Sequence, residues 1–368
     1  MKFRIGELTS IRTGKLDANA SSEDGQYPFF TCSREPLKID TYSYDCECVL
    51  VAGNGDLNVK YYNGKFDAYQ RTYIIEDNSN GKLYMPYLYW FMQGYVEELR
   101  KQAIGGVIKY IKLGNLTEAM IDLPSVDEQR EVVKRMEIAF DIISEQRSLM
   151  TSLDDLIKSR FVEMFGDPIS NPMNWNQMTF RQAGVRLSDG PFGSNLKSEH
   201  YTDEGVRVIR LGNIGVGKFI DDDKSFVSNS HYETIKKYTC KAGDIVIGTL
   251  GEPNLRACIV PETIKFAINK ADCVHYIPKE ELFNNCFVCQ YINCPETLLL
   301  ASRMIHGQTR ARISSGQIAE LPIYVPPKEL QEQFAEFVEQ VDKLKVELQK
   351  TMEETQILFD SLMQRYFS

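Results

Sequence analysis

The stretch LPSVDEQREVVKRMEIAFDIISEQRSLMTSLDDLIKSRFVEMFG at residues 123–166 decides the fold, because the chain uses it twice. When Gly105 is placed on Gly307, this stretch aligns without a gap with VPPKELQEQFAEFVEQVDKLKVELQKTMEETQILFDSLMQRYFS at residues 325–368. Identical pairs include Gln129/Gln331, Glu137/Glu339, Leu156/Leu358 and Phe165/Phe367. Two copies predict a pseudo-twofold arrangement, since a solenoid needs about three repeats or more. Duplex DNA is a partner with matching pseudo-twofold symmetry.

Each copy predicts a long amphipathic helix. After its opening proline, each copy runs for about 40 residues without another proline, and its apolar residues follow a 3-4 spacing. At 1.5 Å per residue, each helix would span about 60 Å. A single helix of that length would leave its apolar stripe in water, so we expect the two to pack together as a coiled coil, with polar interruptions at Asp154, Thr351 and Thr355. The alternative is that each helix packs on its own domain.

Strand and turn signals fill the segment before each helix. In the first segment we expect strands at 48–52, 59–62 and 71–75 and a helix at 87–102. In the second we expect strands at 206–211, 244–249, 256–260 and 271–277, with helices on either side of Pro295. The predicted class is α+β: a mixed α/β globule at 1–122, a helix at 123–167, a second globule at 168–324 and a second helix at 325–368.

Bulk composition indicates a soluble, intracellular protein. The chain has 368 residues, no apolar run of the roughly 18 residues that a membrane span needs, and no signal-peptide core in MKFRIGELTS. Nine cysteines at irregular spacing argue against a disulfide framework and favour a reducing cytoplasm. The net charge is −9, and most of it lies in the two helices. The globules are near neutral, which permits a basic groove without demonstrating one.

Sequence motifs give no support for catalysis. The run Gly212–Lys218 resembles a phosphate-binding loop, but Phe219 stands where a Ser or Thr must hold magnesium, so a turn between strands explains it better. Cys286, Cys289 and Cys294 suggest zinc, yet no second Cys/His pair follows at zinc-site spacing, and buried thiols are common in cores. The four histidines are scattered, and no nucleophile or paired-carboxylate arrangement is visible.

Loops at strand ends carry the residue types that contact DNA, because Arg and Lys read guanine, Asn and Gln read adenine, and Ser and Thr reach the backbone. In the first globule the candidate DNA-binding residues are Lys60, Tyr61, Lys65, Tyr69, Gln70, Arg71, Lys109, Tyr110 and Lys112. In the second they are Ser194, Asn195, Lys197, Arg210, Asn213, Lys218, Asn254, Arg256, Asn269, Lys270, Gln308, Thr309, Arg310 and Arg312. Each could be an ordinary solvated side chain, but the set recurs in both globules.

These features together resemble the specificity subunit of type I restriction-modification enzymes. The resemblance covers nearly the whole chain and rests on the order globule, helix, globule, helix and on local phrases: SDGPFGSNLKSEHY (188–201), VRVIRLGNI (206–214), AGDIVIGTLGEPN (242–254), GQTRARIS (307–314) and PSVDEQREVV (124–133). Proline followed shortly by Glu-Gln at the head of the helix is typical. The first copy has Glu128-Gln129, whereas the second has Leu330-Gln331.

The resemblance implies a subunit without catalysis of its own. Each globule would be a target-recognition domain that reads one half of a bipartite DNA sequence, and the helices would pack antiparallel as the spacer. Adenine-N6 methyltransferase subunits, expected to be two, would bind S-adenosylmethionine. A translocating endonuclease would use ATP and magnesium. This chain would bind no cofactor and no metal. The alternatives are a protein-interaction scaffold, the specificity chain of a system with a fused methyltransferase-nuclease, and a small nuclease.

Overall fold

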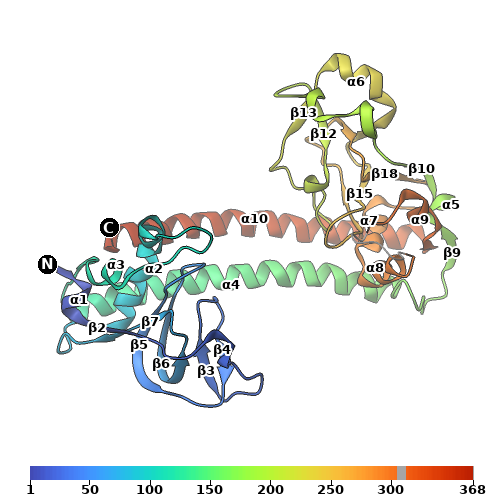
Figure 1. Cartoon of the computed structure of the whole chain (residues 1–368). Coiled ribbons are helices and arrows are strands. Elements are labelled where there is room, and N and C mark those ends of the chain that lie inside the picture. Colours follow the sequence, from blue (N-terminus) through green and yellow to red (C-terminus); the bar gives the residue numbers. More distant parts are fainter. Residues whose placement is uncertain (305–311, 368) are drawn as a thin grey trace. The chain divides into compact units, whose positions relative to one another are not determined.

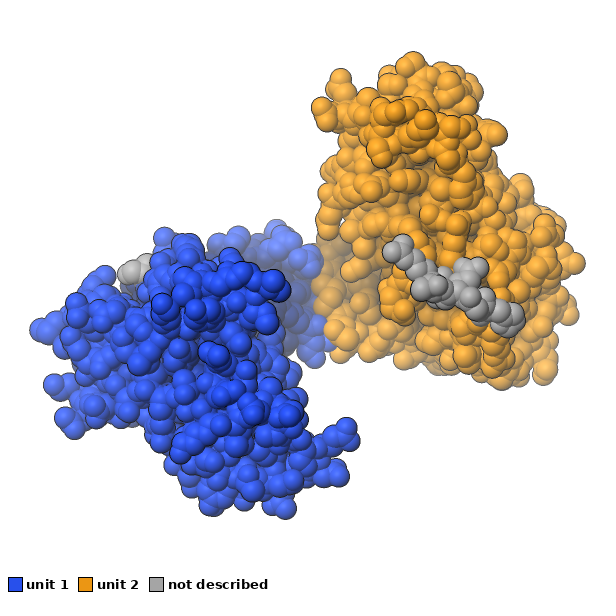
Figure 2. Space-filling model, viewed as in Figure 1, with its two compact units in different colours: residues 1–148, 348–368 blue, residues 149–347 orange. Residues whose placement is uncertain are grey.

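The computed structural model describes residues 1–304 and 312–367 (Figure 1). They form two compact units, unit 1 with residues 1–148 and 348–368 and unit 2 with residues 149–347 (Figure 2). Two helices of 40 residues, α4 (Val126–Phe165) and α10 (Lys328–Phe367), each contribute to both units. The predicted combination of mixed α/β globules with two long helices is therefore confirmed. Within the described residues, no helix has both the length and the apolar character that a membrane crossing requires.

Unit 1 is built on a six-stranded sheet with the strand order β2-β7-β5-β6-β3-β4. A separate two-stranded sheet joins β1 to β8. The strands of unit 1 are β1 (Lys2–Arg4), β2 (Thr9–Thr13), β3 (Tyr27–Phe30), β4 (Leu37–Ile39), β5 (Tyr44–Ala52), β6 (Val59–Ala68), β7 (Thr72–Asp77) and β8 (Met120–Asp122). Its helices, besides parts of α4 and α10, are α1 (Ile5–Leu8), α2 (Met85–Gln102) and α3 (Leu113–Thr117).

The core of unit 1 forms where helix α2 covers the central strands. Leu88, Met92 and Leu99 of α2 recur at helical spacing and are fully buried. They join Val49 and Val51 of β5 in one apolar cluster. At about 25 cal/mol per Å² of buried apolar surface, such a cluster is the main stabilising contribution to the unit.

Unit 2 contains two larger sheets and one short sheet. The strand orders are β10-β18-β15-β16, β11-β13-β12-β17-β14 and β19-β9. The strands are β9 (Asn176–Thr179), β10 (Gly184–Ser188), β11 (Tyr201–Thr202), β12 (Val206–Ile209), β13 (Ser225–Val227), β14 (Thr239–Lys241), β15 (Ile245–Gly248), β16 (Arg256–Ile259), β17 (Phe266–Asn269), β18 (Cys273–Pro278) and β19 (Pro322–Val325). The helices, besides parts of α4 and α10, are α5 (Phe180–Ala183), α6 (Asn229–Ile235), α7 (Asn285–Asn293), α8 (Pro295–Ser302) and α9 (Ser315–Glu320).

Two of the three apolar clusters among the described residues of unit 2 join its sheets and its helices. One contains residues of both larger sheets, Ile209 of β12, Val246 of β15 and Cys258 of β16. The other packs α7 against the long helices, and there the ring centroid of Phe161 lies 5.5 Å from those of both Phe287 and Phe334. These clusters fix the strand ends from which the loops of unit 2 project.

The same short framework precedes both long helices. In unit 1, β1 pairs with β8, and the amide of Ile5 donates to the carbonyl of Ala119 at 2.9 Å. In unit 2, β9 pairs with β19, and the amide of Phe180 donates to the carbonyl of Leu321 at 3.0 Å. The alignment found in the sequence places Ala119 on Leu321, so the internal repeat is also a repeat of hydrogen bonding.

One buried glutamine fixes the start of each long helix. Gln129 Oε1 accepts from the Tyr84 amide at 2.8 Å, and its Nε2 donates to the carbonyls of Lys82 and Pro124 at 2.8 and 2.9 Å. Gln331 makes the corresponding three bonds, each at 2.9 Å, to Asn284, Leu282 and Pro326. Both glutamines have no exposed surface.

The residue before the glutamine differs between the copies. Glu128 caps the first helix by accepting from the amide of Ser125 at 3.0 Å. Pro327 and Leu330 replace these two residues, so that cap cannot form in the second copy. Lys328 instead donates from Nζ to the carbonyl of Phe283 at 2.7 Å. The glutamine, which both copies keep, is therefore the common anchor.

Within each unit, α4 and α10 contact each other. In unit 1, Arg135 Nη1 of α4 donates to the Tyr366 hydroxyl of α10 at 2.8 Å, and Gln146 donates to Thr355 at 3.3 Å. In unit 2, Asp154 of α4 pairs with Lys345 of α10 at 2.7 Å. The predicted polar interruptions Asp154 and Thr355 thus have polar partners on the other helix.

Candidate nucleic-acid interface

Three turns meet along one edge of unit 1. The Gly53 amide donates to the Arg71 carbonyl at 2.8 Å, and the Ile111 amide donates to the Gly53 carbonyl at 2.9 Å. The Gly55 amide also donates to the Lys109 carbonyl at 3.0 Å. We call residues 53–58, 69–71 and 104–112 loop edge 1. These backbone hydrogen bonds bring together segments that are far apart in the sequence.

Unit 2 has an edge built in the same way. The Thr249 amide donates to the Asp272 carbonyl at 3.0 Å, and the Ile313 amide donates to the Thr249 carbonyl at 3.1 Å. Leu250 also forms a bridge with Arg312. We call residues 249–255, 269–272 and 312–313 loop edge 2. Because Ile111 aligns with Ile313 in the repeat, the two edges occupy equivalent positions in their units.

Loop edge 1 carries exposed basic residues. Arg71, Lys109 and Lys112 are exposed, and Tyr110 beside them is 38% exposed. Lys60, at the start of β6, hydrogen-bonds the Asn58 side chain of the edge, and burial lowers the pKa of its ammonium group. The structure thus brings together five residues that the sequence analysis selected separately.

Basic residues of loop edge 2, and Arg210 beside it, lie near aromatic rings of neighbouring segments. Arg210 lies 5.9 Å and Lys270 lies 5.6 Å from the ring centroid of Tyr201. Arg312 lies 5.9 Å from the centroid of Phe192 and pairs with Asp272 at 2.7 Å. Basic side chains held over aromatic faces are an arrangement that suits phosphates and stacked bases.

A glycine allows the Phe192 loop to approach this edge. A Cβ atom at Gly190 would lie 2.2 Å from the Asn269 carbonyl oxygen, a backbone atom that cannot move aside. Only glycine fits there, and the close approach positions residues 190–200 next to the 269–272 turn. Ser194, Asn195 and Lys197 lie exposed in this loop, and the Asn195 carbonyl is 2.9 Å from His231 Nε2.

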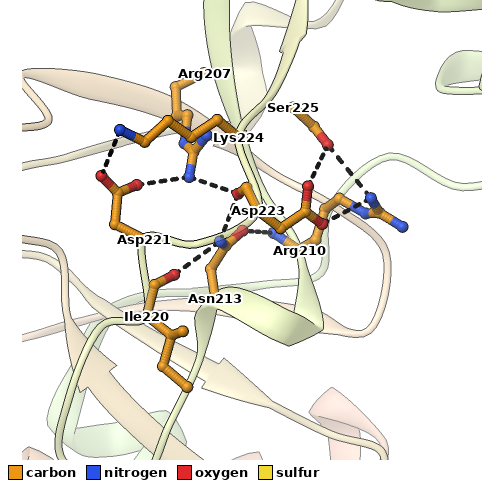
Figure 3. Close-up of polar contacts among 8 residues, drawn as sticks. All are labelled: Arg207, Arg210, Asn213, Ile220, Asp221, Asp223, Lys224 and Ser225. Atoms are coloured by element: carbon orange, nitrogen blue, oxygen red, sulfur yellow. Dashed lines mark hydrogen bonds and ion pairs between the residues drawn. The ribbon is translucent and has the colours of Figure 1, made fainter. Parts of the chain in front are cut away.

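An acidic turn braces the end of β12 (Figure 3). Arg207 Nη2 donates to Asp221 Oδ1 at 2.8 Å and to the Asp223 carbonyl at 2.7 Å. Asn213 donates from Nδ2 to the carbonyls of Ile220 and Asp223, both at 2.9 Å. Arg210 Nη1 pairs with Asp223 Oδ2 at 2.8 Å but keeps 42% of its side chain exposed. A phosphate would compete with Asp223 for Arg210.

Three of the predicted DNA contacts have side chains that are buried or bonded inside the fold. Asn213 and Asn269 have no exposed surface, and Asn269 donates to the Cys273 carbonyl at 2.6 Å. Arg256 is half-buried and donates to four backbone carbonyls at 2.6–3.0 Å, those of Leu211, Ile214, Leu250 and Pro253. These side chains stabilise the loops from inside, so they are not free to meet a base.

Of the other candidates, Tyr61, Lys65 and Lys218 lie outside the two loop edges, whereas Gln70 lies within loop edge 1. Tyr61 donates to Glu47 at 2.7 Å, Lys65 lies 4.7 Å from the Tyr42 ring, and Gln70 donates to Asp17 at 2.8 Å. Lys218 lines a separate groove of about 720 Å³ in unit 2. The half-buried Tyr69 and Asn254 lie within loop edges 1 and 2. Gln308, Thr309 and Arg310 lie outside the described residues.

Phe192 and Tyr201 are not among the residues predicted from the sequence. Both aromatic rings lie against basic residues of loop edge 2. Phe192 and Tyr201 both belong to the phrase at 188–201 that contains Ser194 and Asn195. Aromatic residues interleaved with polar loop residues were therefore the signal that the sequence offered.

The metal and phosphate motifs have structural explanations. Cys289 and Cys294 are buried in the core around α7, and burial raises the pKa of Cys286 to about 12. Across residues 1–304 and 312–367, no group of three His, Cys, Asp or Glu side chains could hold a metal ion. Residues 212–218 lie between β12 and β13, so they form a turn between strands as predicted.

Comparison with known families identifies the protein class that this chain resembles. The model of the family described as "Type I restriction modification DNA specificity domain" matches residues 1–149 and 194–357. The chain is 37% identical over 154 residues to the type I restriction enzyme EcoDI specificity subunit of Escherichia coli. That match covers 42% of this chain and only 34% of the EcoDI subunit.

Other relatives extend the likeness along the chain. The type I restriction enzyme MjaVIII specificity subunit of Methanocaldococcus jannaschii is 20% identical over 370 residues, covering 93% of this chain and 85% of that protein. The crystal structure of the type I restriction-modification S subunit from M. genitalium superposes with a TM-score of 0.61 at 17% identity, covering 100% and 96% of the two chains. A structure from a study of type I R-M complex assembly gives 0.59 at 15% identity, covering 100% and 97%. The structural matches show a shared fold.

Proposed function

The chain belongs to the type I restriction modification DNA specificity family, and we propose that it selects the DNA sequence on which a type I restriction-modification complex acts. Its role is recognition of DNA and not catalysis. Each unit would read one half of a bipartite target. Reading by two equivalent units explains why the chain carries two loop edges with the same backbone construction.

The pair of loop edges is the observation that carries this proposal. Both edges carry basic residues, Lys109 and Lys112 on edge 1 and Lys270 and Arg312 on edge 2, and the repeat aligns Arg312 with Tyr110 of edge 1. Lysine and arginine neutralise phosphates, and arginine also reads guanine in the major groove. We assign Ser194, Asn195 and Lys197 of the neighbouring loop to backbone and base contacts.

The two long helices would act as the spacer. We propose recognition domains at 1–122 and 168–324 and spacer helices at 123–167 and 325–368, with the helices packed antiparallel as a coiled coil. The contacts of Arg135 with Tyr366 and of Asp154 with Lys345 support this packing. A rigid spacer would set the half-sites about one helical turn apart on one face of the duplex.

Partner subunits would dock on the helices. In unit 1, Ile138 and Ile142 of α4 are 53% and 41% exposed, and their 4-residue spacing places them on one face of the helix. An exposed apolar stripe of this kind indicates a protein interface. We propose that adenine methyltransferase subunits, two in number, cover it and that a translocating endonuclease joins them.

The reactive groups would come from those partners. We propose that the methyltransferases hold S-adenosylmethionine and that the endonuclease uses ATP and magnesium. Recognition of cellular DNA implies a cytoplasmic location, which suits the free thiols of all nine cysteines.

Co-expression tests the proposal. The chain is produced with an adenine methyltransferase of the same restriction-modification system in a host that lacks other adenine methylation, and long-read sequencing maps methyladenine. We expect one bipartite motif, methylated in both halves. Methylation without a defined motif, or none when the two proteins form a complex, would contradict the proposal and would favour a protein-interaction scaffold.

A further inference from the structure

The tip of loop edge 1 exposes apolar side chains to water. Ile104 and Tyr110 exchange two backbone hydrogen bonds of 3.0 and 2.9 Å, which close a five-residue tip at 105–109. Val107 at this tip is 104% exposed and Ile108 is 63% exposed. Gly105 has a φ of +119°, a conformation that favours glycine and allows the chain to turn there. The structure thus fixes the base of a loop whose apolar end has no cover.

The charge around this tip favours a polyanion as its partner. Between Leu99 and Thr117 the chain has four basic residues and no Asp or Glu, although the whole chain has a net charge of −9. Arg100 and Lys101 are paired with Glu97 and Glu98, which leaves Lys109 and Lys112 as the cations next to the tip. Neither Lys109 nor Lys112 forms an ion pair with any residue that the structure describes. Two free cations next to an apolar tip complement the phosphates and the stacked bases of DNA.

The position of the tip agrees with this partner. The Gly55 amide bonds the Lys109 carbonyl and the Ile111 amide bonds the Gly53 carbonyl, so the tip is fastened to the turns that make loop edge 1. A protein that reads DNA with this edge brings Val107 and Ile108 to the duplex. Burial of two β-branched side chains between bases would remove them from water.

We propose that Val107 and Ile108 form an apolar wedge that enters the base stack in the half-site read by unit 1, while Lys109 and Lys112 bind the flanking phosphates. This inference rests on the proposed function. A methyltransferase must move its target adenine out of the stack, and the energy needed is least where stacking is already disturbed. The wedge would therefore be a positioning element for base extrusion by the partner subunit.

The test uses the assembled complex of this chain with its methyltransferase, bound to a duplex that contains the motif found by methylome mapping. Permanganate oxidises unstacked thymines, so the thymine opposite each target adenine reports extrusion. In the variant Val107→Ser/Ile108→Ser we expect permanganate reactivity and methylation to fall at least about ten-fold at one half-site. The other half-site serves as an internal control and should not change.

Two further variants separate a wedge from a general effect. Val107→Leu/Ile108→Leu keeps an apolar tip and should retain reactivity at both half-sites. Met120→Ser removes an exposed apolar side chain of β8, outside loop edge 1, and should also leave both half-sites reactive.

Several outcomes would overturn the wedge. These are unchanged reactivity at both half-sites, equal loss at both, or loss of methyltransferase binding in the absence of DNA, which would make the tip a protein contact. If the wild-type complex methylates no defined motif, the proposed function fails. If it methylates a defined motif and the serine variant behaves as wild type, only the wedge fails.

Discussion

Substitution of the buried glutamine at the head of a spacer helix gives the sharpest test of the duplicated framework. In Gln129→Ala, the Tyr84 amide and the carbonyls of Lys82 and Pro124 lose their partners. Each hydrogen bond contributes about 1 kcal/mol net, and a buried group left without a partner costs about 1–3 kcal/mol. We therefore expect the free energy of unfolding of unit 1 to fall by about 3 kcal/mol or more.

The repeat makes the same prediction for the second unit. Gln331 forms three equivalent bonds, so Gln331→Ala should lower the free energy of unfolding of unit 2 by a similar amount. Gln349→Ala is the matched control, because Gln349 is an exposed residue of α10 whose side chain bonds only Glu353 among the described residues. Its effect should stay within about 0.5 kcal/mol.

Urea unfolding of the complete chain can follow each unit separately. The chain has two tryptophans, Trp90 in unit 1 and Trp175 in unit 2. Replacing one or the other with Phe leaves a single fluorescent reporter in a known unit. Gln129→Ala should shift the midpoint reported by Trp90 more than that reported by Trp175. A loss under about 1 kcal/mol for either glutamine would refute the reasoning, as would a larger shift in the wrong unit.

Three further predictions concern recognition, spacing and pH. Arg312→Ala should weaken binding of motif-containing DNA by the complex roughly ten-fold in fluorescence anisotropy and reduce its salt dependence, whereas Lys343→Ala should not; equal affinity would remove Arg312 from the interface. A heptad inserted into α4 should change the distance between half-sites in the methylome and leave their sequences intact, so an altered half-site sequence would count against the spacer. Burial raises the pKa of Asp244, but the hydrogen bonds from His275 Nε2 at 2.8 Å and from the Lys241 amide, together with the charges of these two residues, outweigh it, and the pKa lies below its ordinary value. The stability that this carboxylate gives unit 2 is therefore present above about pH 4 and lost as pH falls through its folded pKa. In Asp244→Asn, the free energy of unfolding of unit 2, followed by Trp175 fluorescence, should decrease less as the pH is lowered.

The sequence predicted the features that depend on periodicity and repetition. The 3-4 spacing and the prolines before each helix predicted helices close to α4 (Val126–Phe165) and α10 (Lys328–Phe367). Apolar runs predicted the central strands of both units, including β5 and β15, because buried strands are rich in aliphatic residues. The short strands β9 and β19 escaped prediction, since their pairing is fixed by tertiary contacts.

The candidate interface was less predictable, because composition does not reveal which way a loop side chain points. Asn213 and Arg210 stand three residues apart in one phrase, yet one is fully buried and the other is 42% exposed. Arg256 has the residue type of a DNA contact but binds four carbonyls inside the fold. The meeting of 53–58 with 104–112 depends on long-range hydrogen bonds that local patterns do not encode.

Cryo-electron microscopy of the assembled complex on a duplex carrying its methylated motif tests the central claim most directly. We predict that loop edge 1 contacts one half-site and loop edge 2 contacts the other, with Lys109, Lys112, Lys270 and Arg312 at the DNA. A duplex bound elsewhere on this chain, or held by one edge alone, would contradict the account.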